Sequence, residues 1–467
     1  MRGSAGIAAV LVLVAAQGLW NAAAQPGFWG YDEGAHAGFA LAIREGGLPH
    51  PLSGWVTFHP PAAHVVAAAA WALAEPFGSR ASLVALRLPS LFGALTLVAA
   101  AWWLARRLGA SERLALCAAL VAGALPPVQL AASMIGNEAF AAGAAAVALC
   151  ALVALQQDPR RSRVAVVAGA FAGLAAATKF SGLCLLATCA LPYLRRDLDA
   201  RALRAAALCA AAGLAVAGPV YLRNVVTAGT PLPMTRTEKA PMVAGEGVFD
   251  PGPRRLADYA SIPLTCGQHP YIQIVAEGGL VAGLDPAMRS VPCLVYTGLW
   301  FDPFGVRATR LHPRDGVGWG VALLYAGLVP SLLVALGFAR MTARSLRSRG
   351  RAPEAPLVLA SALCAGSFLA FTWMIPSLVA AKSSYLLPLV PPAAVAFTHG
   401  CALLPPLARR AAVALSFAAA ALAFAVFTTG VVFAPAPREI SLAFWTRVGA
   451  ALPGSHIAEA AQRLLAP

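Results

Sequence analysis

Apolar stretches long enough to cross a lipid bilayer recur along the whole chain, and arginine-rich segments separate many of them. A transmembrane helix needs about 20 mostly apolar residues. Hydrophobic residues make up 59% of the 467 residues and charged residues only 12%, whereas a soluble domain is about 45–50% apolar and about 25% charged. The pattern therefore predicts an all-α, polytopic helical membrane protein rather than a soluble fold.

The net charge of +15 comes almost entirely from arginine, because the chain has only three lysines. In a soluble protein such a charge would suggest nucleic-acid binding, but no basic patch alternates with aromatic residues, so we expect no nucleic-acid partner. Membrane proteins instead concentrate Lys and Arg in the loops that face the cytoplasm. The arginine clusters that set this orientation lie at residues 106–113, 160–163, 195–204, 340–351 and 409–410.

With these clusters inside, the chain crosses the bilayer about eleven times, starting from a cytoplasmic N-terminus. The expected spans are 7–24, 87–105, 114–130, 138–155, 164–178, 181–194, 205–222, 317–339, 356–375, 384–402 and 411–434. For the first span, a cleaved signal peptide is the alternative, because Ala22-Ala23-Ala24-Gln25 resembles a signal-peptidase site.

This threading divides the chain into a transmembrane domain at 1–435 and a short external tail at 436–467 that carries no motif. It leaves two long external loops, at 25–86 and 223–316, which are rich in polar and aromatic residues. Long ordered loops tend to carry function. Within the first loop, the apolar segment 62–75 is short for a span, so we expect an interfacial helix there.

The nine cysteines show no CxxC spacing, so the sequence does not support a zinc or redox site. Cys266 and Cys293 both fall in the second external loop. A non-cytoplasmic compartment would permit a disulfide between them, and the sequence leaves open whether they pair.

The first external loop opens with an acidic segment, WGYDEGAH (29–36), a few residues beyond the first span. Adjacent carboxylates at a membrane edge are costly unless they are paired, hydrated or used. Asp32, Glu33 and His36 are therefore candidate functional residues. The alternative is a hydrated loop in which Asp32 only caps a helix, a position that favours Asp.

Two further candidates lie on the expected outer side, one within the first external loop and one at the outer end of a span. His59 stands in the segment TFHPP (57–61), before the short apolar helix, and could hold a phosphate or orient a substrate. Glu138 is the only acid in a long apolar region, which makes it a functional candidate. The alternatives are a surface histidine and a helix N-terminal acid that faces the helix dipole.

Lys179 and Lys382 lie at expected outer ends of spans, where the positive-inside pattern would not place them. Cations at the outer interface suit the phosphate of a lipid. Arg87 and Arg223 occupy similar positions and join this candidate set. The alternative is that these long side chains are snorkelling anchors.

In this order, the segments resemble landmarks of the membrane-embedded GT-C glycosyltransferases, above all the bacterial lipid-carrier-dependent enzymes related to protein O-mannosyltransferases and aminoarabinose transferases. The matching segments are YDEGAH (31–36), HPP (59–61), RLPSLFGALT (87–96), SMIGNE (133–138), TKFSG (178–182), LRN (222–224) and KSSYLLP (382–388). Each motif is weak alone, and the resemblance covers about residues 1–235 and 380–395.

The resemblance implies transfer of a sugar from a polyprenyl-phosphate carrier to an acceptor outside the cytoplasm, usually with inversion. By the resemblance, Asp32 is the base or acceptor-orienting carboxylate, and Glu33 is its partner. Glu138 and His36 would position the acceptor or a metal. The expected donor-phosphate residues are His59, Lys179, Arg223 and Lys382. Some relatives hold a divalent cation near the acidic loop, but the sequence shows no ligand set that establishes a cofactor.

The chain departs from the family in places. Gly34 and Ala35 stand between Glu33 and His36, which is one residue more than in the mannosyltransferases, and loop 223–316 matches no landmark. Its aromatic segment 300–305 could stack on a sugar or pack on the membrane surface. The competing interpretations are a transporter or lipid-linked sugar flippase and a non-catalytic relative. The arginine-rich style suggests a bacterial inner membrane.

Overall fold

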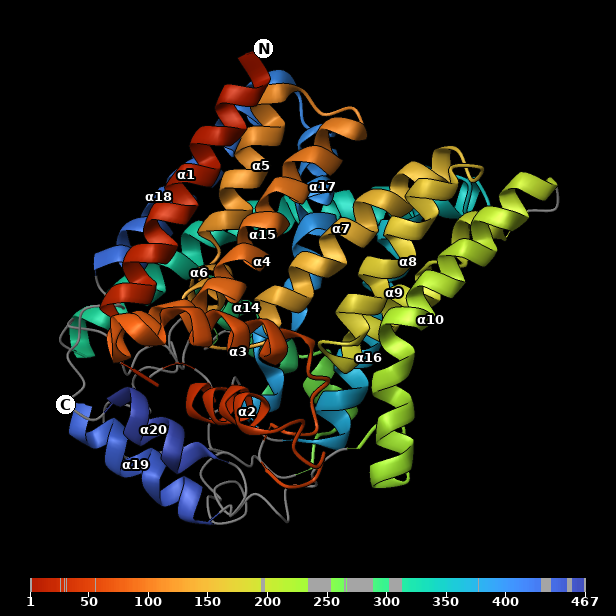
Figure 1. The fold of residues 1–467 in the computed structure, drawn as a ribbon. Helices are drawn as coiled ribbons and strands as arrows, with labels where there is room; N and C mark the ends of the chain where they lie inside the picture. Colours follow the sequence, from red (N-terminus) through yellow and green to blue (C-terminus); the bar gives the residue numbers. More distant parts are fainter. Residues whose placement is uncertain are drawn as a thin grey trace.

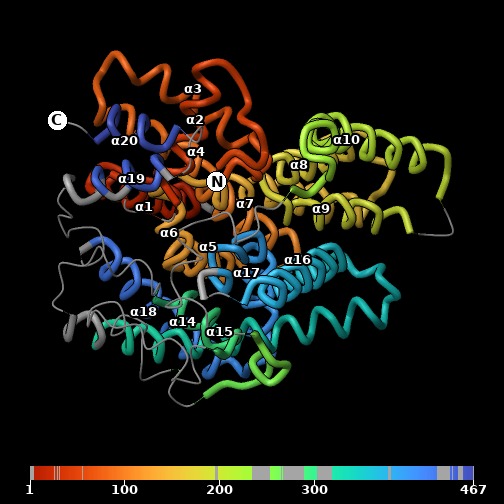
Figure 2. The backbone as a smooth tube through the Cα atoms, turned by 90° about the horizontal axis from the view of Figure 1, so that it is seen from below, coloured from red at the N-terminus to blue at the C-terminus, as the bar shows by residue number. Residues whose placement is uncertain are grey.

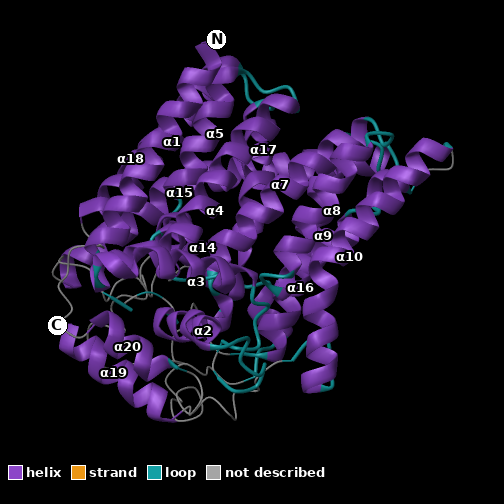
Figure 3. Cartoon of the chain, in the orientation of Figure 1, coloured by secondary structure: helices purple, strands orange, loops and turns teal. Residues whose placement is uncertain are grey.

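The computed structural model describes residues 2–25, 27–28, 30, 32–54, 56–194, 198–233, 253–263, 266, 289–301, 313–376, 378–429, 438–451 and 456–465. All regular elements in these ranges are helices (Figure 3). Tyr31, Arg195, Arg196 and residues 302–305, which figured in the sequence analysis, lie outside the described residues.

The described helices confirm an all-α membrane protein, because seven of them are long and apolar enough to cross a bilayer. These are α1 (Arg2–Ala24), α4 (Ser79–Arg107), α7 (Glu138–Gln157), α10 (Ala200–Ala228), α15 (Pro313–Arg347), α16 (Ala355–Met374) and α18 (Pro406–Thr429). Each of them coincides with an expected span.

The other four expected spans are broken or short, so the count of about eleven is not confirmed. Helices α5 (Glu112–Ala124) and α6 (Pro126–Ala132) form one apolar pair bent by 63°, with prolines at the start of α6 that cannot continue the hydrogen-bond ladder. The remaining elements are α8 (Ser162–Ala176), the pieces η2 (Phe180–Gly182), α9 (Leu183–Thr188) and η3 (Leu191–Tyr193), and the pair η9 (Ser383–Leu389) and α17 (Val390–Cys401).

Small residues allow several of these helices to approach each other closely. Gly93 on α4 faces the backbone of α7 at Ala139, and Gly143 on α7 faces Gly93 in return. On the other side of the bundle, Gly337 on α15 and Gly400 on α17 make a similar contact. Such contacts are typical of helix packing in membranes, where close van der Waals contact replaces the hydrophobic effect.

Four helices gather at the end of the bundle opposite the N-terminus, and we call this the loop end (Figures 1 and 2). They are α2 (Glu33–Glu45), α3 (Ala62–Ala74), α19 (Arg438–Ala451) and α20 (Ile457–Leu465). Helix α3 runs across the ends of the long helices (Figure 1), in the segment expected to be interfacial. The expected tail thus contains a helical hairpin, α19–α20, which packs on α2.

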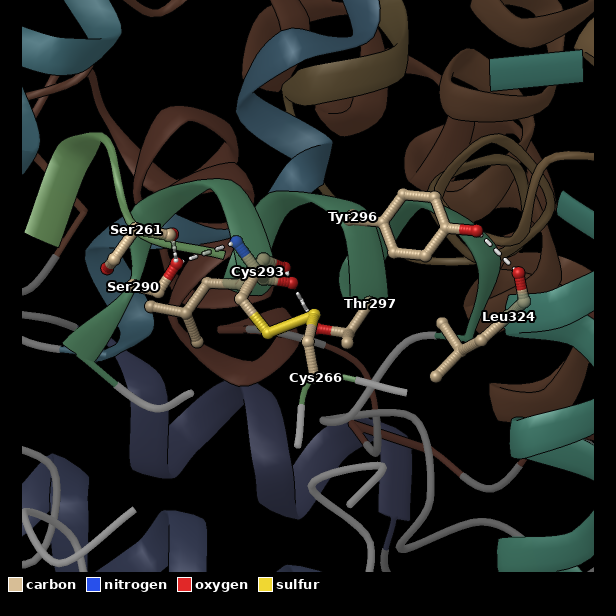
Figure 4. Close-up of a disulfide and its surroundings, with 8 residues drawn as sticks. Ser261, Cys266, Ser290, Cys293, Tyr296, Thr297 and Leu324 are labelled. Atoms are coloured by element: carbon tan, nitrogen blue, oxygen red, sulfur yellow. Dashed lines mark hydrogen bonds between the residues drawn. A yellow bond between two sulfur atoms is a disulfide. The ribbon is translucent and has the colours of Figure 1, made fainter. Parts of the chain in front are cut away.

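The second external loop is described only in part. Its described helices are η5 (Leu256–Tyr259) and α14 (Val291–Trp300), and two further short elements among the described residues are η1 (Glu75–Phe77) and η8 (Leu378–Ala381). Cys266 and Cys293 form a disulfide with a Cα–Cα distance of 5.7 Å, which ties this loop to α14 (Figure 4). Trp300 and Phe301 are buried, and the Trp300 indole donates to Ser331 Oγ at 2.9 Å. These two aromatic residues therefore pack inside the bundle.

Candidate active site

Asp32 stands at the N-cap position of α2 in the left-handed backbone region, with φ 54°, but its side chain makes no capping hydrogen bond. Its Oδ2 instead lies 4.0 Å from Lys382 Nζ. The Asp32 side chain is 31% exposed, while that of Lys382 is only 10% exposed. The carboxylate is therefore not used for helix capping and remains open on one side.

Glu33, the next residue, has a different environment. Its side chain is fully buried, and Arg87 Nε and Nη2 donate to Glu33 Oε1 and Oε2 at 3.1 Å each. The backbone N–H groups of Gly30 and Ile135 donate to the same carboxylate at 2.9 and 2.8 Å. A buried ion pair is tolerated when hydrogen bonds satisfy both partners. Glu33 therefore joins α2 to α4 and to the segment before α7, and it does not share the open position of Asp32.

A second acid–lysine pair lies nearby. Glu138 is the first residue of α7, and its Oε1 lies 2.9 Å from Lys179 Nζ. Lys179 follows α8 and sits 4.2 Å from the ring centroid of Tyr385. The amide of Asn137 donates to the backbone carbonyl of Thr178 at 3.3 Å, which connects the two chain segments that carry the pair.

Tyr385 connects the two pairs in space, because Lys179 Nζ lies over its ring and its backbone N–H donates to the Lys382 carbonyl at 3.2 Å. Asp32, Glu138, Lys179 and Lys382 thus come from four distant parts of the sequence and form one cluster of two acids and two lysines at the loop end. The structure brings together in this cluster four of the nine residues that the sequence singled out.

Three histidines form a group beside the cluster, with His36 and His64 buried and His59 half-buried. His36 Nδ1 lies 2.8 Å from His64 Nε2, and the His36 and His59 rings are stacked with centroids 6.2 Å apart. Burial lowers the pKa of His36 against the opposing charges of Glu138 and Asp32. Burial and then Lys179 lower the pKa of His59 to about 3, and burial lowers the pKa of His64 well below its usual value. All three imidazoles are therefore neutral near pH 7.

The sequence analysis did not single out His64. It lies in the first turn of α3, shortly after the HPP segment. The sequence signal that could have identified His64 is a histidine at the start of an otherwise apolar helix. Its ring also stacks on Phe39, with centroids 4.2 Å apart, so it fastens α3 to α2 next to the cluster.

Arg223 is not joined to the cluster by the contacts that the structure describes. Its guanidinium donates to the carbonyl of Leu48 at 3.3 Å and also to the carbonyl of Pro49. The His50 ring contacts the Thr227 carbonyl at 3.0 Å. Arg223 therefore holds the segment after α2 against α10.

The cluster does not fit a divalent cation. Asp32 and Glu138 each face a lysine ammonium, whereas a hard cation needs several oxygen ligands. Among the described residues, one group of three potential ligands occurs, formed by Glu45, His456 and Glu459. That group lies at the other end of α2, and Arg463 already pairs with both of its carboxylates. The described carboxylates therefore form no site that would support a metal-dependent step.

An apolar cavity of about 460 Å³ begins next to the cluster. Helices α5, α14, α15 and α17 and the segment η9 line it. Ser383 lines its wall and directly follows Lys382 in the chain. Other lining residues are Leu125, Tyr296, Trp300, Val334 and Phe397. A cavity lined in this way suits a hydrocarbon ligand.

Comparisons with known proteins relate the chain to solved structures only. Neither a protein-family model nor a curated protein sequence matches it. The structure is similar to the Archaeoglobus fulgidus oligosaccharyltransferase in the apo form, with a TM-score of 0.54 and 13% identity over 94% of this chain and 58% of that one. The same protein in complex with Zn and sulfate gives a TM-score of 0.53 and 16% identity over 94% of this chain and 55% of that one.

The chain thus spans 58% of the length of the apo oligosaccharyltransferase. A weaker similarity is to ArnT from Cupriavidus metallidurans in the apo state, with a TM-score of 0.39 and 17% identity over 95% of this chain and 80% of that one. At such identities a structural likeness establishes the fold. The likeness to the oligosaccharyltransferase confirms that the chain has the membrane fold of GT-C glycosyltransferases, as the sequence resemblance implied.

Proposed function

We propose that the protein is a membrane glycosyltransferase that moves a sugar from a polyprenyl-phosphate carrier to an acceptor on the non-cytoplasmic side. The observation that carries this proposal is the cluster of Asp32, Glu138, Lys179 and Lys382 beside an apolar cavity, whose wall includes Ser383, the residue after Lys382. A base, two cations and an apolar space for part of a lipid chain are the groups that such a reaction needs, and the fold is one that glycosyltransferases use.

In the proposed reaction, the acceptor oxygen forms a bond to the anomeric carbon while the bond from that carbon to the phosphate oxygen breaks. Asp32 takes the proton of the acceptor hydroxyl, because its carboxylate is partly exposed and free of capping bonds. Positioned general bases contribute about 10²–10⁴-fold to rate. Attack from the face opposite the phosphate gives inversion.

The leaving group is a polyprenyl phosphate, which gains a negative charge as the bond breaks. Lys382 and Lys179 stabilise this charge as point cations. Glu138 keeps Lys179 in place and orients the acceptor. The carrier's hydrocarbon chain occupies the apolar cavity behind Ser383. No step of this reaction runs through a divalent cation.

The remaining candidates have supporting roles. Glu33 fixes the beginning of α2 through Arg87, so it holds Asp32 in place. His36 and His59 are neutral and present hydrogen-bonding rings rather than charges to the donor. Arg223 shapes the rim of the site by holding the segment at Leu48 and Pro49.

We propose a bacterial inner membrane as the location, with the loop end in the periplasm. Two features support this orientation. The arginine clusters lie in the turns at the other end of the bundle, as expected for cytoplasmic loops. The Cys266–Cys293 disulfide ties a loop-end segment to α14, and disulfides persist in the periplasm but are rare in the cytosol.

The test is sugar transfer from radiolabelled polyprenyl-phosphate sugars by membranes that contain wild-type protein or Asp32→Asn. We expect label to reach a lipid, glycan or protein fraction with wild type and to fall about 10²–10⁴-fold with Asp32→Asn at equal expression. Glu75→Gln is the matched control, because Glu75 is an acid of the same loop that is 51% exposed and pairs with Arg44.

Full transfer by Asp32→Asn would show that another group is the base. If the folded wild type transferred label from none of the carriers, the enzyme proposal would be wrong, and a flippase or a non-catalytic relative would replace it.

A further inference from the structure

The acidic loop that carries Asp32 has an unfavourable backbone. Phe28 has φ 58° and Asp32 has φ 54°. Asp tolerates this left-handed region, but a bulky residue such as Phe adopts it only where its surroundings hold it. The contacts that hold Phe28 therefore influence where Asp32 points.

One of these contacts comes from the far end of the sequence. Trp445, on α19, is 6% exposed, and its indole Nε1 donates to the Phe28 carbonyl at 3.0 Å. The Phe28 and Trp445 rings also meet edge to face, with centroids 6.3 Å apart. The indole thus holds both the carbonyl and the side chain of the strained residue.

The same indole lies against the first turn of α2. A Cβ added to Gly34 would come within 2.4 Å of Trp445 Cδ2. A glycine at this position lets the ring pack directly on the helix backbone. This contact accounts for a glycine between Glu33 and His36, where the sequence departs from the related mannosyltransferases.

Helix α20 keeps the hairpin on α2. Its apolar face is buried against α2 and α4 in a hydrophobic cluster that also includes residues of α3. The residues that it contributes are Ile457, Ala460, Ala461, Leu464 and Leu465. At the other end of α2, Glu45 pairs with Arg463 and lies 3.5 Å from His456 Nδ1. The hairpin therefore contacts both ends of the helix that begins next to Asp32.

We propose that the hairpin α19–α20 is part of the active site, with Trp445 as a positioning residue that holds Phe28 and the start of α2 so that Asp32 faces Lys382. The proposal rests on the proposed transfer reaction, in which Asp32 is the base. Trp445 acts through Phe28 and Gly34 and does not touch the reacting atoms.

The first test compares Trp445→Phe with wild type in the transfer assay. The variant keeps an aromatic ring near Gly34 but lacks the N–H that reaches Phe28. We expect kcat to fall about ten-fold, because small misplacements of a reacting group cost rate, while KM for the donor stays within about two-fold. Arg447→Ala is the control on the same helix, because Arg447 is exposed and its guanidinium donates to the Ala443 carbonyl one turn back.

A double-mutant cycle checks the route of the effect. Gly34→Ala alone should lower kcat, because its methyl group collides with the indole. In a Trp445→Ala background the same change should cost little. Additive losses would contradict direct contact between the two positions.

A second measurement does not depend on activity. Hydrogen exchange of the amides at residues 32–36 should be faster in Trp445→Phe than in wild type, with Arg447→Ala unchanged. Faster exchange with an unchanged kcat would overturn the positioning role, and unchanged exchange would overturn the proposal altogether. If wild type shows no transfer, the proposed function fails, and the exchange result alone decides whether Trp445 holds the loop.

Discussion

The charge pairs beside the candidate site differ in burial from those at the end of the bundle where α1 begins. Beside the site, the pairs Glu33–Arg87 and Glu138–Lys179 have side chains no more than 22% exposed, whereas Arg44–Glu75 and Arg463–Glu45, farther out at the loop end, are more open to solvent. At the end where α1 begins, the pair Arg160–Asp199 has side chains 61% and 41% exposed. Arg106–Glu112 and Arg161–Asp158 are similarly open to solvent, although Glu354, beside Arg344, is buried.

Under the proposed function, this difference separates charges that set orientation from charges that position the reacting groups. Exposed pairs contribute little to stability, and cytoplasmic arginines act mainly on the direction of insertion. Buried charges must be paired and hydrogen-bonded, so each one restrains its neighbours. The buried pairs beside the candidate site therefore fix the geometry that the proposed reaction needs, whereas the exposed pairs at the opposite end restrain little.

The largest effect on stability should come from breaking the buried pair. Arg87→Ala leaves Glu33 buried without a counter-charge, which typically costs about 3–5 kcal/mol. We expect a marked loss of folded protein and a lower midpoint of unfolding in detergent. Arg87→Lys is the comparison variant, because it keeps the charge but loses the paired hydrogen bonds to both carboxylate oxygens. A wild-type midpoint for Arg87→Ala would remove the contrast between the two ends.

Much of the fold follows from features that sequence reasoning can use. Span length and arginine placement can be predicted because they depend on the bilayer and not on contacts between particular residues. Proline-interrupted spans such as 114–130 could not be foreseen as bent, because neighbouring helices satisfy the backbone groups that a bend exposes. The bend in the α5–α6 pair is set by its packing as well as by its sequence.

The candidate site shows a similar division. Asp32, Glu138, Lys179 and Lys382 stand out because acids and lysines are scarce in this chain. The partner role of Glu33 came from the family resemblance, which does not report that adjacent residues at the start of a helix point in different directions. Trp445 lies 417 positions from Phe28, and no local sequence pattern predicts a contact between residues so far apart in the chain.

A smaller effect should appear in acid. The pKa values of His36, His59 and His64 are all lowered on folding, to about 3 for His59. Between pH 6.5 and the folded values, the unfolded chain binds protons that the folded chain does not, so stability falls as pH falls. Each imidazole contributes up to about 1.4 kcal/mol per pH unit in that window.

The measurement is the unfolding midpoint between pH 6.5 and 5, above the range in which most carboxylates titrate. His59→Gln should make the dependence on pH shallower, because one buried imidazole no longer takes up a proton on unfolding. A slope equal to that of wild type would mean that His59 is hydrated and not buried.

The smallest effect should come from the exposed end. Arg160→Ala removes one partner of the Arg160–Asp199 pair, whose Nε and Oδ2 lie 3.0 Å apart. Exposed pairs of this kind contribute about 0–1 kcal/mol, so the unfolding midpoint should barely move, and transfer activity should stay at the wild-type level. Salt should screen what remains of the interaction. The informative measurement is therefore the orientation of the protein in the membrane. It is reported by the accessibility of an engineered cysteine in the 158–163 turn. A large loss of stability in Arg160→Ala would mean that exposed charge pairs also restrain the fold. It would contradict the proposed difference between the pairs beside the site and those at the opposite end.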